Sequence, residues 1–299
     1  MTPSVLLFLV DAANEFQQLL RSEAEAAAGR AGVELRVTFT GVDFSAQLVQ
    51  LRRAVAERPQ ALLVMSVRDR GLVRVAAEAA REGIHWVFLN RSEDDLEELR
   101  RTFPKVALTT VSPDEAETGR IQGRLVGQLA PAGTRVLYVE GSRRSLAARD
   151  RSAGFKETLE GSGLDLVFLE AGWSLAESRD AVREWLRVAL RARWRLGLVG
   201  GQNDLIASGA IEALDEVATE MGRAELKEVP VVGCDGTPDF GQRLVAEGRL
   251  KATVVLPLWT GLAVETIART LRTGILPPPV VSVQPTAFPP EHQLHRARG

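Results

Sequence analysis

Short apolar runs alternate with longer amphipathic stretches along the first third of the chain. The runs are rich in Val, Leu and Ile, which is typical of strands buried on both faces of a parallel sheet. The stretches between them place apolar residues at the spacing of a helix that packs one face against a core. We therefore expect strands at 5–10, 33–39, 61–65 and 85–89, with helices at about 15–31, 45–57 and 72–82.

The same rhythm returns in the second half of the chain. It predicts strands at 136–139, 164–169, 196–199, 229–234 and 252–256, with helices at about 147–160, 175–190, 204–218 and 261–271. These are too many β-α units for one typical open sheet, so we expect an α/β protein with two similar lobes, each on a parallel sheet. The rhythm breaks near Thr109 and near Pro257. The breaks predict one lobe from 1–109 plus 257–282 and a second from 110–256 plus 283–299.

Length, charge and cysteine content narrow the class of protein. The 299 residues suit two ordinary domains, and a formal net charge of −2 gives no reason to expect nucleic-acid binding. The single cysteine, Cys234, excludes an intrachain disulfide and a cysteine-based metal cluster. Two of the three histidines, His292 and His295, lie in the last residues of the chain, so we expect no histidine metal site.

The first residues do not have the pattern of an export signal. The apolar run 5–10 is short and follows no basic residue, so we interpret it as a buried strand. No apolar stretch approaches the roughly 20 residues that a membrane span needs. We therefore expect that the protein either acts in the cytoplasm or has had an export signal removed or omitted.

Motifs for catalysis and for nucleotide binding are not found. Gly200 and Gly201 follow an apolar run, but no G-x-G-x-x-G follows the first predicted strand, and there is no G-x-x-x-x-G-K-[ST] loop. No Ser-His-Asp or Cys-His arrangement can be assigned. The sequence therefore predicts a protein that is not an enzyme and that uses no cofactor or metal.

Polar side chains collect directly after the predicted strands. Ligands of parallel α/β sheets bind beyond the carboxyl ends of the strands, so this clustering predicts a cleft for a polar ligand. The residues concerned are Asp11, Asn14, Phe16, Asn90 and Arg91 in the first half, and Glu140, Ser142, Arg151, Gln202, Asn203, Asp204, Asp235 and Gly236 in the second.

Two of these residues also have a purely structural interpretation. Asp235 precedes Gly236 and suits a tight turn, but its carboxylate could equally accept two hydroxyl hydrogens of a ligand. Asn203 suits the N-cap of the helix that follows it. Because Asp204 is an equally good cap, we favour a ligand contact for Asn203.

The aromatic residues near the strand ends raise the same question. Aromatic rings stack on the C–H faces of sugars, and they also bury a large area in protein cores. Phe16 lies in a polar loop, so we favour stacking on a ligand for it. For Trp173, which follows Ala171 and Gly172, both interpretations stay open, and Trp259 is expected to pack near a hinge.

At these residues the chain resembles the periplasmic sugar-binding proteins of the ribose-binding type and the related effector domains of LacI-type repressors. The resemblance runs from about residue 5 to residue 283, and the order and spacing of its motifs make it specific. It implies a type I periplasmic binding protein fold, in which two Rossmann-like lobes are joined by three hinge strands. The closest stretches are VFLNRSE at 87–93, SLAARDRSAGFKETL at 145–159, GQNDLIASGAIEAL at 201–214 and VPVVGCDGTPDFGQRLVAEGRLKATVV at 229–255.

The resemblance also implies a ligand-binding set, in which a sugar is held between aromatic faces and a ring of charged or amide side chains. The chain departs from the family where Gln17 replaces a frequent aromatic, Asn90 replaces Asp and Leu256 replaces Gln, and these departures argue against plain ribose. The candidate set is Asn14, Phe16, Asn90, Arg91, Arg151, Trp173, Asn203 and Asp235.

Three functions can be compared on this basis. We expect a solute-binding protein that closes around a sugar or polyol and serves ABC-type import or chemoreception. It would be a periplasmic monomer, with a membrane permease or chemoreceptor as its partner and no nucleic acid. The alternative is a cytoplasmic LacI-like effector-sensing domain, although no helix-turn-helix is found before the first predicted strand. An enzyme is the weakest interpretation because no acid-base pair can be assigned.

Overall fold

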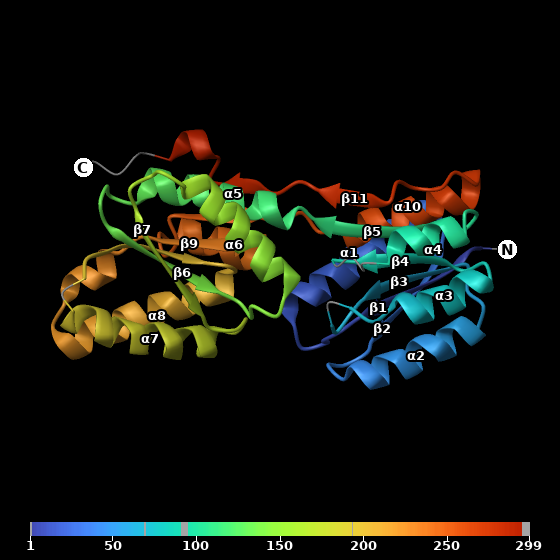
Figure 1. Ribbon diagram of the computed structural model, residues 1–299, viewed down its shortest axis with the longest axis horizontal. Coiled ribbons are helices and arrows are strands. Elements are labelled where there is room, and N and C mark those ends of the chain that lie inside the picture. Colours follow the sequence, from blue (N-terminus) through green and yellow to red (C-terminus); the bar gives the residue numbers. More distant parts are fainter. Residues whose placement is uncertain (1, 69, 91–94, 193, 295–299) are drawn as a thin grey trace. The chain divides into compact units, whose positions relative to one another are not determined.

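The chain forms two compact units (Figure 1). The computed structural model describes residues 2–68, 70–90, 95–192 and 194–294. The first unit is Met1–Pro113 with Pro257–Val283, and the second is Asp114–Leu256 with Gln284–Gly299. The chain therefore passes from one unit to the other three times.

The first unit is built on a six-stranded sheet in the order β11-β5-β4-β3-β1-β2, and each pair of neighbouring strands is parallel. The strands are β1 (Ser4–Leu9), β2 (Glu34–Phe39), β3 (Ala61–Met65), β4 (His85–Leu89), β5 (Leu108–Pro113) and β11 (Val280–Val283). The helices are α1 (Glu15–Ala31), α2 (Phe44–Ala56), α3 (Val73–Arg81), α4 (Leu96–Thr102) and α10 (Thr260–Thr273).

Helices cover both faces of this sheet because successive strand residues point to opposite sides. Leu7 packs with residues of α1 and α10, such as Ala24 and Ile267. On the other face Leu62 packs with residues of α2 and α3. The strands are therefore buried on both sides, which explains why they are continuous apolar runs in the sequence.

The second unit repeats this arrangement in the order β12-β10-β9-β8-β6-β7, and only the short β12 runs antiparallel to its neighbour β10 among the strands described. The strands are β6 (Arg135–Glu140), β7 (Asp165–Glu170), β8 (Leu196–Gly201), β9 (Val231–Asp235), β10 (Ala252–Val255) and β12 (Thr286–Phe288). The α-helices are α5 (Glu115–Leu129), α6 (Leu146–Leu159), α7 (Leu175–Arg191), α8 (Asp204–Met221) and α9 (Arg243–Ala246). Shorter helical turns are the 3₁₀-helices η1 (Ala224–Glu228) and η3 (Glu291–Gln293) and the π-helix η2 (Pro238–Gln242).

Helices α5 and α6 form one layer of this unit, and α7 and α8 form the other (Figure 1). The first pair approaches closely because glycines lie at the contact. A Cβ atom at Gly119 would lie 2.0 Å from the carbonyl oxygen of Arg151, and one at Gly154 would lie 2.0 Å from that of Ala116. Small residues at this contact therefore set how α6 presents its side chains to the end of the sheet.

Helices α7 and α8 are joined at their surface by a regular ladder of ion pairs. The arginines on α7 and the glutamates on α8 each recur every four residues, which places them on one face of each helix. The pairs are Arg179 with Glu212 at 3.7 Å, Arg183 with Glu216 at 3.2 Å and Arg187 with Glu220 at 2.9 Å.

The fold class expected from the sequence is confirmed: both units are α/β, and their sheets are parallel except at β12. The division between the units falls after Pro113, beyond the expected residue 109, because β5 continues to Pro113 and pairs with β4 and β11. The last passage lies between Val283 and Gln284, one residue beyond the expected place. None of the helices in the described ranges is apolar over a length that would cross a membrane.

Candidate functional site

The last residue of β9, Asp235, lies at the carboxyl end of the second sheet in an unusual backbone conformation. Its φ is +101°, in the region that favours glycine, and Gly236 follows with a φ of +58°. A non-glycine residue holds this conformation only where its surroundings fix it. The side chain keeps 23% of its surface exposed. The carboxylate of Asp235 is thus presented at the sheet edge by a constrained turn.

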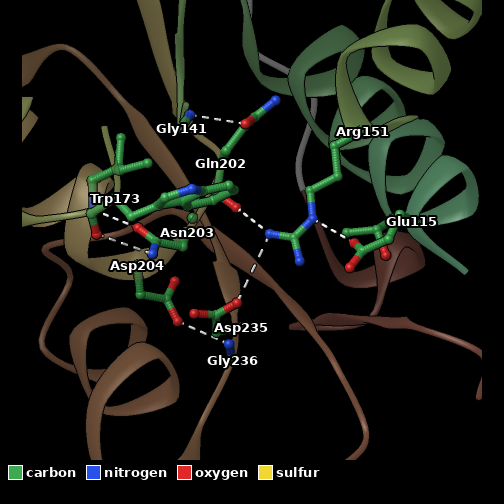
Figure 2. Close-up of polar contacts among 12 residues, drawn as sticks. Glu115, Gly141, Arg151, Trp173, Gln202, Asn203, Asp204, Asp235 and Gly236 are labelled. Carbon is green, nitrogen blue, oxygen red and sulfur yellow. Dashed lines mark hydrogen bonds and ion pairs between the residues drawn. The ribbon is translucent and has the colours of Figure 1, made fainter. Parts of the chain in front are cut away.

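The neighbouring carboxyl group of Asp204 fixes that turn from behind. Asp204 is the first residue of α8 and is 2% exposed. Its Oδ2 accepts a 2.8 Å hydrogen bond from the backbone N–H of Gly236 (Figure 2). Its Oδ1 accepts one of 2.7 Å from the hydroxyl of Thr253. A Cβ atom at Gly233 or Gly241 would lie 2.1 or 2.0 Å from this carboxyl group. The two glycines therefore make room for the buried acid.

Arg151, on α6, points its guanidinium toward the same edge of the sheet. It is 5% exposed, and Figure 2 shows it between Glu115 on one side and Gln202 and Asp235 on the other. Its Nε donates to Oε2 of Glu115 and its Nη1 to the carbonyl oxygen of Gln202, both at 2.6 Å. Asp235 Oδ1 lies 3.9 Å from Nη1. The guanidinium is therefore held in place by groups from three different elements.

Gln202 ties together the loops around this arginine. It is fully buried; its Oε1 accepts from the backbone N–H of Gly141 at 2.9 Å. Its Nε2 donates to the carbonyl oxygen of Ala148 and to the hydroxyl of Ser152, both at 2.9 Å. Although the sequence places Gln202 among the polar residues after the strands, its amide is committed to this internal support.

Trp173 and Asn203 lie on the other side of the cluster. The Trp173 ring packs directly against Gly141, where a Cβ atom would lie 2.3 Å from the ring, and its centre is 6.0 Å from the Arg151 guanidinium. Asn203 Nδ2 is 3.5 Å from the carbonyl oxygen of Trp173 (Figure 2). Trp173 as a whole is half-buried.

From the sequence we expected Asp204 to cap α8 and Asn203 to contact the ligand, and the expected cap is wrong. Asn203, not Asp204, caps α8, because its Oδ1 accepts a 2.7 Å hydrogen bond from the backbone N–H of Ile206. Asp204 lies one position inside the helix and turns toward the β9 turn instead. The cap uses only the oxygen of the Asn203 amide, so a ligand contact through its nitrogen stays a prediction.

The two acids have raised pKa values. Burial raises the pKa of Asp235 to about 7, against the opposing effect of Arg151, while the Glu115 carboxylate adds to the rise. Burial and the charge of Asp235 raise the pKa of Asp204 to about 8, although hydrogen bonds from Thr253 and the backbone lower it. For Arg151, burial lowers the pKa, but the nearby carboxylates raise it well above its usual value. Arg151 is thus the permanent cation of the cluster.

The candidates from the first unit lie at the carboxyl ends of its strands. Asn14 caps α1, since its side chain accepts from the backbone N–H of Gln17 at 3.1 Å. The Phe16 ring packs 5.5 Å from that of Trp259, at an angle of 44°. Asn90 has a φ of +63°, and its buried Oδ1 has no hydrogen-bond partner among the residues described. Arg91 lies outside the described residues.

Gln17 has a structural role. It occupies a position where proteins of the ribose-binding type often have an aromatic residue. Its Oε1 accepts from the backbone N–H groups of Val10 and Asp11, at 2.8 and 3.0 Å. The Gln17 side chain therefore stabilises the conformation of the loop after β1. Leu256 is 4% exposed and belongs to the apolar layer under α5 and α6.

The structure thus brings Arg151, Trp173, Asn203 and Asp235 together in the second unit. Sequence reasoning named Gln202 and Asp204, which help to position them, but it missed Glu115, which holds the guanidinium of Arg151. Across the part of the chain that is described, no group of three or more His, Cys, Asp or Glu side chains could hold a metal ion. The cluster offers hydrogen-bond donors, carboxylates and an aromatic face at one sheet edge.

Two α/β units, one with such a cluster at the carboxyl ends of its strands, define a two-lobed class of ligand-binding protein. The chain belongs to the periplasmic binding protein domain family, whose match covers residues 5–259. The family expected from the sequence is confirmed.

Individual relatives cover most of the chain. The D-ribose/D-allose-binding protein of Pseudomonas aeruginosa is 26% identical over 257 residues, which are 84% of this chain and 76% of that protein. A solved ABC transporter periplasmic solute-binding protein from Actinobacillus succinogenes, with bound D-allose, has a TM-score of 0.84 at 18% identity, covering 98% of this chain and 99% of that one. The Caulobacter myo-inositol binding protein, bound to myo-inositol, has a TM-score of 0.77 at 21% identity, covering 95% and 92%. The likeness to these solved structures establishes the type I fold.

Proposed function

We propose that this protein is a solute-binding protein that closes around a sugar or polyol and serves ABC-type import or chemoreception. The observation that carries the proposal is the cluster of Arg151, Trp173, Asn203 and Asp235 at one edge of the second sheet. It combines rigid hydrogen-bonding groups with the aromatic ring of a half-buried tryptophan.

The chemistry of the cluster suits a ligand with several adjacent hydroxyl groups. A carboxylate such as that of Asp235 accepts two hydroxyl hydrogens through charge-assisted hydrogen bonds. The planar guanidinium of Arg151 donates to hydroxyl oxygens in a fixed geometry. The ring of Trp173 offers an apolar face for the C–H groups of a sugar.

The ligands named for the relatives support this class of ligand. The Pseudomonas protein is named for D-ribose and D-allose, and the two solved structures contain D-allose and myo-inositol. All are uncharged and carry a hydroxyl group on most carbon atoms. Similarity to transport proteins favours import or chemoreception over the effector-domain alternative and over an enzyme.

The binding set draws on both units, so we propose that the ligand stabilises a closed form. The first unit would contribute Asn14, Phe16, Asn90 and Arg91, and the second would contribute the four residues of the cluster. A ligand that contacts more groups in the closed form than in the open form shifts the population toward closure. The three passages of chain between the units would act as the hinge.

Periplasmic location, a membrane permease or chemoreceptor as partner, and the absence of a nucleic-acid partner complete the proposal. They rest on membership of the periplasmic binding protein family. A binding protein of this kind must present both lobes to its membrane partner, so we also propose that it is a monomer.

The decisive experiment is a ligand screen followed by calorimetric titration of one variant. D-ribose, D-allose, myo-inositol and related sugars are tested for a rise in melting temperature, because a ligand of the native state alone must raise it. The best ligand is then titrated into wild type and Asp235→Ala. We expect the variant to bind at least about tenfold more weakly, as for loss of a charged hydrogen bond worth about 1.5–3 kcal/mol.

The matched control is Asp239→Ala, which removes an exposed aspartate four residues away. It should bind as wild type does. Equal affinity in wild type and Asp235→Ala, with both folded, would show that the ligand does not bind at this cluster. No thermal shift with any member of the panel would argue against a sugar or polyol as the ligand.

A further inference from the structure

The positive charge of Arg151 is balanced by neighbouring carboxylates within the candidate site. Its Nε donates to Glu115 at 2.6 Å, and both side chains are buried, at 6% and 8% exposure. On the other side Asp235 lies 3.9 Å away. We propose that Glu115 determines specificity by neutralising Arg151, so that the site selects uncharged polyhydroxyl ligands over sugar acids and sugar phosphates. The inference rests on the proposed function and names its ligand class.

The first step of the argument is the balance of charge in the second unit. A buried arginine without a partner would attract a carboxylate or phosphate group, which arginine recognises well. Here one carboxylate is bonded to that arginine and a second lies beside it. An anionic ligand would therefore meet Asp235 and find no uncompensated cation in this cluster, whereas hydroxyl groups could use the remaining donors of Arg151.

The second step is the way in which Glu115 is held. It is the first residue of α5, directly after Asp114, whose side chain caps the helix. A carboxylate in the first turn is favoured by the positive end of the helix dipole. The close contact of α5 with α6 at Gly119 and Gly154 fixes the distance between the helices that carry Glu115 and Arg151. The charge pair is thus built into the scaffold and does not depend on the ligand.

The third step separates this pair from the ordinary ion pairs of the same helix. Glu117, two residues later, pairs with Arg120 and Arg124 at 3.1 Å, but its side chain is 29% exposed and these two partners are not part of the cluster. A buried ion pair contributes little to stability once desolvation is counted. A role in choosing the ligand explains why a buried pair lies beside Asp235.

The test compares three proteins, wild type, Glu115→Gln and Glu117→Gln, with matched neutral and anionic ligands. The pairs are D-ribose with D-ribose 5-phosphate, D-glucose with D-glucuronate, and myo-inositol with myo-inositol 1-phosphate. Calorimetry gives the ratio of the two dissociation constants within each pair. We expect wild type to prefer the neutral member of the pair that it binds by about a hundredfold or more, because like charges at an interface are strongly unfavourable.

In Glu115→Gln we expect this preference to fall by at least about tenfold, while Glu117→Gln keeps it. A merely structural role would weaken both members of a pair equally, and an unchanged ratio would overturn the inference. Wild type alone also tests it: binding of an anionic member as tightly as its neutral partner overturns the inference, even if Glu115→Gln does not fold. Wild type that binds neither member of any pair, and that shows no thermal shift with any sugar or polyol of the wider panel, removes the proposed function and the inference with it.

Discussion

Replacing Asp204 by Asn should change how the stability of the protein depends on pH. The amide can keep both contacts, since its oxygen can accept from the Gly236 N–H and its NH₂ can donate to the Thr253 hydroxyl oxygen. The variant therefore removes a titrating carboxyl group and keeps the turn before Gly236 in place.

The magnitude follows from the pKa of the buried acid. Burial and the charge of Asp235 raise the pKa of Asp204 to about 8, from 3.8 in the absence of these effects. The folded state therefore holds a proton that the unfolded chain has already lost above pH 4. The stability that this proton provides is present at low pH and is lost as the pH rises through 8. At 1.36 kcal/mol per pH unit, the group alone costs wild type about 4 kcal/mol between pH 5 and pH 8.

The assay is urea unfolding of the ligand-free proteins at pH 5, 6, 7 and 8, followed by circular dichroism. Asp235 titrates in the same direction in both proteins, since its pKa is also raised, to about 7. The difference in unfolding free energy between Asp204→Asn and wild type should therefore grow by about 4 kcal/mol in favour of the variant. Asp215→Asn, at a partly exposed position on the same helix, is the control and should follow wild type. Parallel pH profiles for Asp204→Asn and wild type would refute this account of the buried acid.

Two further predictions concern packing and assembly. Gly154→Ala should lower the unfolding free energy by about 2–3 kcal/mol in urea titration, because its Cβ would lie 2.0 Å from the carbonyl oxygen of Ala116. Gly29→Ala, in a helix position with nothing within 4 Å, should leave stability unchanged or raise it, and an equal loss in both would contradict the packing argument. Light scattering should give the mass of one chain with and without ligand, and a stable dimer would argue against the proposed monomer.

The strands and helices could be predicted because their apolar periodicity is strong. Ser112 and Pro113 have the pattern of a helix start, but the extent of α5 could not be predicted because its buried face carries polar residues, among them Glu115, Thr118 and Gln122, beside glycines. Gln122 is buried because its amide donates to the carbonyl oxygens of Gly201 and Gly233. Hydropathy does not distinguish such bonded polar residues from solvent-exposed ones.

The candidate site could be predicted as a place but not as a network. Parallel sheets put the carboxyl ends of their strands at one edge, which favoured Asp235, and Arg151 was chosen mainly through the resemblance to the ribose-binding type. The sequence does not reveal which of two adjacent polar residues caps a helix, so it did not show that Asn203 caps α8 while Asp204 holds the turn before Gly236. Nor does it show that Glu115, 36 residues before Arg151, is bonded to it.

The ladder of ion pairs between α7 and α8 has a consequence at elevated temperature. Exposed pairs of this kind contribute little at 25 °C. Heating weakens the hydration of charged groups, so the cost of bringing them together falls, while the hydrophobic contribution per unit area levels off. The ion pairs of Arg179, Arg183 and Arg187 with their glutamates therefore contribute a larger share of the stability at high temperature than at 25 °C. The layer of α7 and α8 should therefore lose less stability on heating than its apolar contacts alone would predict.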